Sequence, residues 1–191
     1  MADSLAPDVI EPLLRGRFGR PYLYADSAPS TQRMLDGRQE CAVAVVEEQT
    51  EGRGRLGRRW DAPARSSVLV SILLEPRVAP DRLPELSLVA GRAVAAAIVQ
   101  ATGLSPTVRF PNDVLIAGRK VAGILAEASD GRVVLGVGVN VNQEAGALPD
   151  EATSLRNESG RAVERAPLLV SILASLEREY DTWISGTAAS G

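Results

Sequence analysis

The sequence predicts an α+β domain in which helices flank a mixed, largely antiparallel sheet. In the middle of the chain, apolar runs of strand length follow one another across short turns, which is typical of antiparallel neighbours. Two longer apolar segments, one rich in alanine and one amphipathic, have the length and periodicity of helices. At 191 residues the chain is expected to form a single domain, residues 1–191.

The first part of the chain is expected to supply strands separated by a long loop. The strands are expected at the short apolar runs 21–26, 41–48 and 67–75. A short helix is expected from Ser30, a candidate N-cap, to Gly37. Residues 49–66 are rich in glycine and arginine and have no apolar period, so they are expected to form a loop. Loops of this length in compact domains are commonly functional.

The remaining chain is expected to contain a buried helix, a group of strands and a final helix. The alanine-rich run 83–102 is apolar nearly all round, so it should be a buried helix that ends at Gly103. The strands that follow are expected at 107–110, 112–117, 121–128 and 133–141. Gly118-Arg119 and Asp130-Gly131 are the expected turns, the latter a strong hairpin signal. From about Pro167, apolar residues fall on one face of an amphipathic helix.

Composition narrows the chemistry. The chain has no histidine, which excludes Ser-His-Asp and Cys-His nucleophile systems and the usual imidazole zinc sites. Its one cysteine, Cys41, begins an apolar run and is expected to be a small buried hydrophobic residue. Any metal is therefore expected to be a hard cation held by oxygen, and Mg²⁺ with phosphate is the usual case.

Charge and hydropathy restrict the partners. The net charge of −3 predicts no global attraction to nucleic acid or to acidic membranes. No apolar run approaches the ~20 residues that cross a bilayer. The N-terminus carries acidic residues and lacks the apolar core of a secretory signal. We therefore expect no DNA partner, no membrane partner and a cytoplasmic location.

The basic residues are strongly biased toward arginine. Lysine and arginine total 21, yet Lys120 is the only lysine. Arginine serves wherever a positive charge on a long stem is enough, so the exception indicates a place that requires a compact ammonium with freely aimed donors. Chance is the alternative, and composition alone does not decide between them.

The loop 49–66 contains an anion-binding pattern, which runs Gly52-Arg53-Gly54-Arg55-Leu56-Gly57-Arg58-Arg59-Trp60. Glycine lets backbone N–H groups approach a ligand, and clustered arginines repel one another unless an anion gathers them. A solvated basic loop is the alternative. The run also matches the dinucleotide fingerprint G-x-G-x-x-G. We reject that interpretation because too few residues, Pro63 among them, precede the next strand for a crossover helix.

A second polar site is predicted at the turn before residues 112–117. Pro111 stiffens the chain before Asn112 and Asp113, whose amide and carboxylate suit a metal, a ligand or a lysine. The hairpin that follows returns the chain so that Lys120 can lie near them. An ordinary turn with a surface lysine is the alternative.

Four ordered motifs resemble those of biotin–protein ligases. The glycine–arginine run resembles G-R-G-R-x-G-R-x-W, and residues 109–113, 120–125 and 136–142 resemble K-W-P-N-D, K-x-A-G-I-L and G-I-G-I-N-V-N. Order and spacing agree over roughly residues 22–142. The resemblance implies the fold shared with class II aminoacyl-tRNA synthetases. It also implies a catalytic domain without the family's N-terminal winged helix or C-terminal β-domain, so repressor activity is not expected.

The resemblance implies a ligase that forms biotinyl-5′-AMP from biotin and ATP, with Mg²⁺, and transfers biotin to a lysine of a biotin carboxyl carrier protein. Lys120, Arg53 and Arg55 are the catalytic residues that it implies. The implied biotin contacts are Ser30, Thr31, Gln32, Gln49, Gly52, Arg53, Gly54, Arg55, Lys120 and Gly123. The implied nucleotide contacts are Arg53, Arg55, Trp60, Asn112, Lys120 and Asn140, and Asp113 is the candidate Mg²⁺ ligand.

The chain departs from the motifs in places, and alternatives stay open. Gln32 stands where the family has asparagine, and Arg109-Phe110 replace Lys-Trp. A lipoate or octanoate ligase of the related fold is one alternative, although those families typically carry a histidine that this chain lacks. A nucleotide-binding module without turnover is another. The resemblance does not decide between a monomer and a homodimer.

Overall fold

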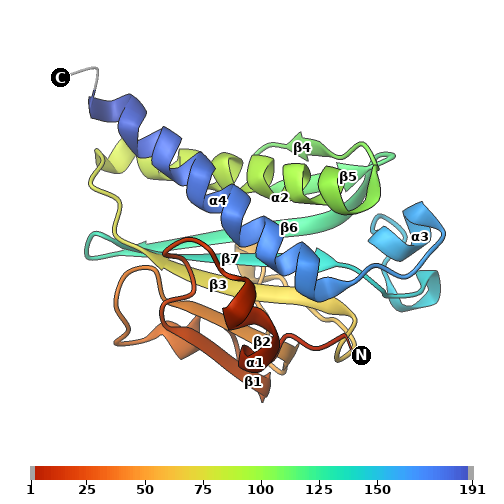
Figure 1. Ribbon diagram of the computed structural model, residues 1–191. Coiled ribbons are helices and arrows are strands. Elements are labelled where there is room, and N and C mark those ends of the chain that lie inside the picture. The colour runs from red at the N-terminus through yellow and green to blue at the C-terminus, as the bar shows by residue number, and fades with distance from the viewer. Residues whose placement is uncertain (1–2, 189–191) are drawn as a thin grey trace.

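The computed structural model describes residues 3–188, which form a seven-stranded sheet with its long helices on one face (Figure 1). The strand order is β1-β2-β3-β7-β6-β5-β4. β1 and β2 pair in parallel, and the other neighbours pair antiparallel. The predicted fold class, a mixed and largely antiparallel sheet flanked by helices, is confirmed.

The elements follow the predicted apolar runs. The strands are β1 (Tyr22–Ala28), β2 (Val43–Gln49), β3 (Ser67–Leu74), β4 (Thr107–Arg109), β5 (Asp113–Ile116), β6 (Arg119–Ser129) and β7 (Arg132–Asn140). The helices are α1 (Pro7–Ile10), α2 (Leu86–Thr102), α3 (Leu155–Ser159) and α4 (Arg165–Ala188). The short α1 and α3 have no predicted counterpart. The helix expected from Ser30 to Gly37 is a single 3-10 turn, Arg33–Leu35.

Two tight turns join β5, β6 and β7. Asp130 and Gly131 have φ values of 52° and 76°, the left-handed values that a two-residue hairpin turn requires. This is the predicted turn. The other turn lies at Ala117 and Gly118, with φ of 49° and 79°, one residue earlier than predicted. It lies earlier because Arg119 already pairs with β5 as the first residue of β6.

Side chains along β7 alternate between two faces of the sheet, one covered by helices and the other open. Four apolar residues of β7 belong to the core, namely Val133, Leu135, Val137 and Val139. Gly136 and Gly138 lie between them and therefore point to the opposite face. Because glycine has no side chain, that face of the sheet has room for a ligand.

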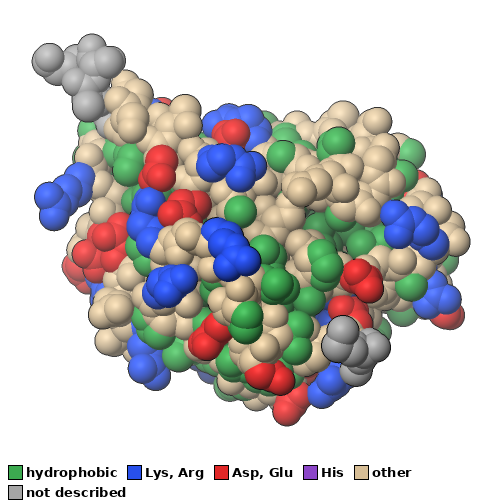
Figure 2. Space-filling model, in the orientation of Figure 1, with side chains coloured by type: hydrophobic (Ala, Val, Ile, Leu, Met, Phe, Trp, Pro, Cys, Tyr) green, Lys and Arg blue, Asp and Glu red, His purple; other side chains and the backbone are tan. Residues whose placement is uncertain are grey.

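α2 and α4 pack side by side across the helix-covered face (Figure 1). The predicted stripe of α4 is buried, namely Leu169, Ile172, Leu173, Leu176, Tyr180 and Trp183. α2 ends at Gly103, whose φ of 75° gives the predicted left-handed cap. Figure 2 shows acidic and basic side chains interspersed over this face, in keeping with a small net charge.

One helical stretch reaches the length and hydropathy of a membrane span. The helical stretch Pro80–Thr102 has 23 residues, and its most apolar part has a mean hydropathy of 1.3, so by length and composition alone it could cross a membrane, although charged residues interrupt its apolar run. About 44% of that stretch's apolar window is buried, and its buried residues, from Leu86 to Ile98, pack into the core. Core packing against α4 and β6 accounts for the apolar character of this helix.

Cys41 is less buried than predicted. The residue precedes β2, has a φ of 69° and packs against the core while part of its surface stays exposed. Burial raises the pKa of its thiol, so the thiol is protonated at neutral pH. The interpretation as a packing residue holds, but its position is at the edge of the core.

A buried arginine links the start of α4 to the sheet. The guanidinium of Arg165, which is 0% exposed, donates to Glu47 at 2.5 Å, to Asp3 at 2.8 Å and to the Ser67 carbonyl at 3.1 Å. Glu47 is 1% exposed and also accepts a bond from the Tyr24 hydroxyl. Buried charges are tolerated when they are paired and hydrogen-bonded in this way. This network was not predicted.

Candidate functional site

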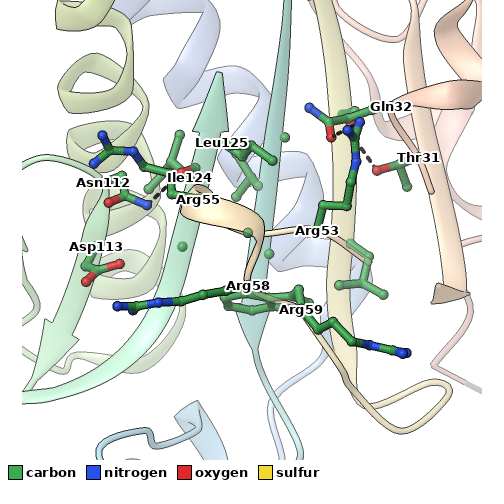
Figure 3. Close-up of a pocket in the computed structure, with 18 of the residues that line it drawn as sticks. Thr31, Gln32, Arg53, Arg55, Arg58, Arg59, Asn112, Asp113, Ile124 and Leu125 are labelled. Atoms are coloured by element: carbon green, nitrogen blue, oxygen red, sulfur yellow. Dashed lines mark hydrogen bonds between the residues drawn. The ribbon is translucent and has the colours of Figure 1, made fainter. Parts of the chain in front are cut away.

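A cavity of about 360 Å³ lies on the open face of the sheet, within the volume range of small-molecule sites (Figure 3). Its floor is formed by β3, β6 and β7. One wall is the segment after β1, and the other is the turn between β4 and β5. The glycine–arginine loop, defined as residues 52–60, crosses over the floor.

The cavity brings together most of the residues predicted for the site. Those that line it are Ser30, Thr31, Gln32, Gln49, Arg53, Gly54, Arg55, Trp60, Asn112, Asp113, Lys120 and Gly123. They come from distant parts of the chain, so only the fold assembles them. In particular, the sole lysine and the glycine–arginine loop line the same cavity.

Two predicted residues do not line this cavity. Gly52 lines a second, more open hollow beside the loop. A Cβ at Gly52 would lie 2.1 Å from the Trp60 carbonyl oxygen, so only glycine fits there. Asn140 is 5% exposed, and its amide donates to the Thr153 carbonyl at 3.1 Å and accepts from Gln143 at 3.0 Å. These bonds favour a structural role for Asn140 over the predicted nucleotide contact.

The glycine–arginine loop is a small hairpin in its own right. Trp60 N–H donates to the Gly52 carbonyl at 3.0 Å, and Gly54 N–H donates to the Arg58 carbonyl at 2.8 Å. At the tip, Leu56 has a φ of 59° and is 86% exposed. The backbone of the loop is therefore held by its own hydrogen bonds, while its tip extends into solvent.

The arginines of the loop point in different directions. Figure 3 shows Arg55 and Arg58 extending toward the side of Asn112 and Asp113, whereas Arg53 points toward Gln32. Arg53 pairs with Glu127. Within residues 3–188, no carboxylate forms an ion pair with Arg55 or Arg58. Two unpaired guanidinium groups beside one cavity are the arrangement that a multiply charged anion would complete.

Trp60 rests on a glycine floor. Gly123 of β6 faces Gly138 of β7 in the sheet. A Cβ on Gly138 would lie 2.6 Å from the indole, and one on Gly123 would lie 2.8 Å from it. The indole therefore occupies space that any other residue pair would fill. The Lys120 ammonium lies 5.4 Å from the ring centroid, within range of a cation–π contact.

Gly138→Ala is expected to displace Trp60 and loosen the glycine–arginine loop. The added methyl group would overlap the indole, and overpacking of this kind costs about 1–3 kcal/mol. We expect stronger acrylamide quenching of tryptophan fluorescence than in the unsubstituted protein. Gly146→Ala is the matched control, since its Cβ would meet nothing within 4 Å. Equal quenching in the two variants would contradict the glycine floor.

Lys120 is held in place by its backbone and by Asp113. Its N–H donates to the Glu151 carbonyl at 2.8 Å, and its ammonium lies 2.7 Å from Asp113 Oδ1. Asp113 Oδ2 accepts a bond from Arg109 at 2.7 Å. Burial alone would raise the pKa of Asp113, but the bonds from Arg109 and Lys120 outweigh it and hold the pKa below its usual value. Asp113 is thus an ionised partner of two cations.

This geometry does not fit a protein-held Mg²⁺ ion at Asp113. Both carboxylate oxygens are engaged by cations, which leaves no negative charge to attract a further one. Within the described part of the chain, no group of three or more His, Cys, Asp or Glu residues could hold a metal ion. The structure therefore favours the role of Asp113 as a partner of Lys120 over its predicted role as a metal ligand.

Several residues of the cavity were missed in the sequence. The Ser71 hydroxyl donates a 2.7 Å hydrogen bond to the Thr31 hydroxyl, which in turn donates to Gln49 at 3.1 Å. The only signal for Ser71 is a polar residue inside an otherwise apolar strand. Phe110, 75% exposed at the rim, and Gly136 and Gly138 in the floor were also missed as contacts.

Comparison with known proteins gives a consistent result. The family model described as "Biotin/lipoate A/B protein ligase family" matches residues 24–144. The Bifunctional ligase/repressor BirA of Bacillus subtilis is 35% identical over 181 residues, which cover 87% of this chain and 56% of that protein. The Biotin--[acetyl-CoA-carboxylase] ligase of Mycobacterium tuberculosis is 39% identical over 145 residues, which cover 74% of this chain and 54% of the relative. The chain thus spans about half the length of these relatives.

A solved structure shares the fold. Biotin protein ligase from Aquifex aeolicus, in complex with biotin and ATP, superposes with a TM-score of 0.78 and 31% sequence identity. The match covers 85% of this chain and 71% of that one. The Biotin--[acetyl-CoA-carboxylase] ligase of Paracoccus denitrificans is 35% identical over 79% of this chain and 69% of its own length.

Proposed function

The chain belongs to the biotin/lipoate A/B protein ligase family, and from this premise we propose that it is a biotin–protein ligase. It makes biotinyl-5′-AMP from biotin and ATP and transfers the biotinyl group to a lysine of a biotin carboxyl carrier protein. The observation that carries the proposal is that Lys120 and the glycine–arginine loop line one cavity of about 360 Å³. Relatives named as biotin ligases support the choice of biotin.

In the first step, a carboxylate oxygen of biotin attacks the α-phosphorus of ATP. A new P–O bond forms, and the bond to the departing pyrophosphate breaks. Both reactants are anions, so the site must offset their repulsion. Lys120 offers a compact ammonium at the junction of the two, and Arg55 and Arg58 offer unpaired donors for the phosphates. Asn112 lines the same side of the cavity and would lie near the nucleotide, while its amide NH₂ donates to the Ile124 carbonyl at 3.0 Å.

The other end of the cavity suits the uncharged ring of biotin. Ser30, Thr31, Gln32 and Gln49 line that end, and Arg53 points toward it. Such a division separates hydrogen-bonding groups for the ring from cations for the carboxylate and phosphates. A Mg²⁺ ion that enters with ATP would be held by the phosphates, since the protein carboxylate nearby is already paired.

In the second step, a neutral lysine amine of the acceptor protein attacks the carbonyl carbon of the adenylate. A C–N bond forms, the C–O bond to AMP breaks, and the amine loses a proton. Water would destroy the mixed anhydride, so the loop that crosses the cavity protects it. The exposed Leu56 and Phe110 beside the cavity provide apolar surface for a protein acceptor.

Exchange of labelled pyrophosphate into ATP tests the proposal. We expect exchange that depends on biotin and does not occur with lipoate or octanoate. Labelled pyrophosphate enters ATP only when an acyl-adenylate has formed and then reacts back with pyrophosphate. Exchange with lipoate or octanoate in place of biotin would establish the related ligase activity. If the protein bound ATP but catalysed no exchange with any of the three acids, it would be a nucleotide-binding module, and the proposed activity would be wrong.

A further inference from the structure

Arg53 connects the glycine–arginine loop to two side chains outside it. Its Nη2 donates to Glu127 Oε2 at 2.9 Å and to Gln32 Oε1 at 3.4 Å. Glu127 lies on β6, four residues beyond Gly123 and on the same face of the strand. Gln32 lies in the segment after β1. One guanidinium therefore bridges the loop, the sheet and the far wall of the cavity.

The bond from Arg53 determines which way round the Gln32 amide lies. A guanidinium only donates hydrogen bonds, so the amide must present its oxygen to Arg53. Its NH₂ group is then directed away from Arg53. Gln32 is 7% exposed and lines the cavity, and within residues 3–188 its Nε2 has no hydrogen-bond partner. A buried donor without an acceptor is costly, so this NH₂ group points to an acceptor on the ligand.

Arg53 needs Glu127 to hold this position. The Arg53 side chain is 47% exposed, and a long exposed side chain has many rotamers. Its hydrogen bond to Gln32 is long and goes to a neutral amide. Its hydrogen bond to Glu127 is shorter and joins two opposite charges, so it is the stronger of the two. Glu127 also balances the charge of Arg53, so bound phosphates attract Arg53 less than they attract the unpaired Arg55 and Arg58.

We propose that Glu127 is a positioning residue of the biotin site, which holds Arg53 and thereby keeps the Gln32 NH₂ group turned toward the ligand. The inference rests on the proposed function. Glu127 itself does not line the cavity and lines the second hollow beside the loop. Its effect on the ligand therefore passes through Arg53.

Kinetics of Glu127→Gln test this role. We expect the KM for biotin to rise about 3- to 10-fold, the range that one hydrogen bond contributes. The KM for ATP and the kcat at saturating biotin should change by less than about two-fold, because the phosphate end is untouched. Glu51→Gln is the matched control: it removes another exposed pair beside the same loop, Glu51–Arg33 at 2.7 Å, and does not line the cavity.

A double-mutant cycle separates positioning from general stabilisation of the loop. Gln32→Met keeps the size of the side chain and removes the amide. If Glu127 acts through Gln32, adding Glu127→Gln to Gln32→Met produces no further rise in the KM for biotin. Full additivity of the two effects would refute the proposal, as would equal effects of Glu127→Gln and Glu51→Gln.

Calorimetric titration with biotin tests the proposed function and the proposed role of Glu127 separately. If the unsubstituted protein bound no biotin, the proposed function would fail and this inference with it. If the unsubstituted protein and Glu127→Gln bound biotin equally well, only the role of Glu127 would fail. Weaker binding in Glu127→Gln, with an unchanged thermal midpoint, supports the role of Glu127.

Discussion

Lys120→Ala is expected to lower the rate of biotinyl-AMP formation by about 10²- to 10³-fold, the usual cost of removing one preorganised donor from a transition state. The ammonium lies in the cavity, 2.7 Å from Asp113 Oδ1 and 5.4 Å from the centroid of the Trp60 ring, and a water molecule that filled its place would carry no positive charge. Single-turnover formation of the adenylate, measured with saturating biotin and ATP, isolates this step from later transfer.

Three further variants make the result specific to the Lys120 ammonium. Arg119→Ala removes an adjacent positive charge that pairs with Glu158 outside the cavity and should leave the rate unchanged. Lys120→Arg should also be slow, because a planar guanidinium cannot aim its donors as an ammonium does. Asp113→Asn keeps the ammonium but removes its 2.7 Å partner and should give an intermediate rate. A rate in Lys120→Ala equal to that of the unsubstituted protein would exclude Lys120 from the mechanism.

Arg165→Met is expected to have the largest effect on folding and to lower the free energy of unfolding by about 3–5 kcal/mol. The substitution leaves Glu47, which is 1% exposed, as a buried carboxylate without its cation. It also removes the bond between the start of α4 and the Ser67 carbonyl on β3. Equilibrium unfolding in urea, followed by far-UV circular dichroism, measures the change.

Two controls for Arg165→Met separate charge from packing. Adding Glu47→Gln should recover much of the lost free energy, because no buried charge is then left unpaired. Arg178→Met, at an exposed position of the same helix, should change the free energy of unfolding by about 0.5 kcal/mol or less. An unchanged unfolding midpoint in Arg165→Met would show that the buried network does not stabilise the fold.

Local signals predicted most of the elements correctly. Gly103 ends α2 and Asp130-Gly131 turns β6 into β7 because each needs a left-handed backbone, which few other residues adopt readily. α1 and α3 were missed because four or five residues are too few to show a helical period. The turn at Ala117 was placed one residue late because Gly118 can occupy either central position of a two-residue turn, and the pairing of Ile116 with Arg119 puts it in the second.

The sequence predicted which residues form the candidate site better than it predicted the contacts of those residues. The Lys120 ammonium and the glycine–arginine loop do line one cavity, as their residue types suggested. A lysine partner for Asp113 was one of the expected alternatives, and Lys120 is that partner, but the second ion pair of Asp113, with Arg109, was not foreseen. The amide of Asn140 is likewise used inside the protein. A motif identifies a polar residue but not the partner with which it forms a hydrogen bond or an ion pair.

The sequence by itself determined where the strands, the Asp130-Gly131 turn and the two long helices form and which residue types are available for chemistry, because backbone preference and apolar period are local properties. Only the tertiary structure decided that Trp60 lies on Gly123 and Gly138, that Arg165 is buried against Glu47, and that Arg53 joins Glu127 to Gln32. These contacts join residues far apart in the chain, and the free energy of a buried charge or amide depends on the partners that folding brings to it.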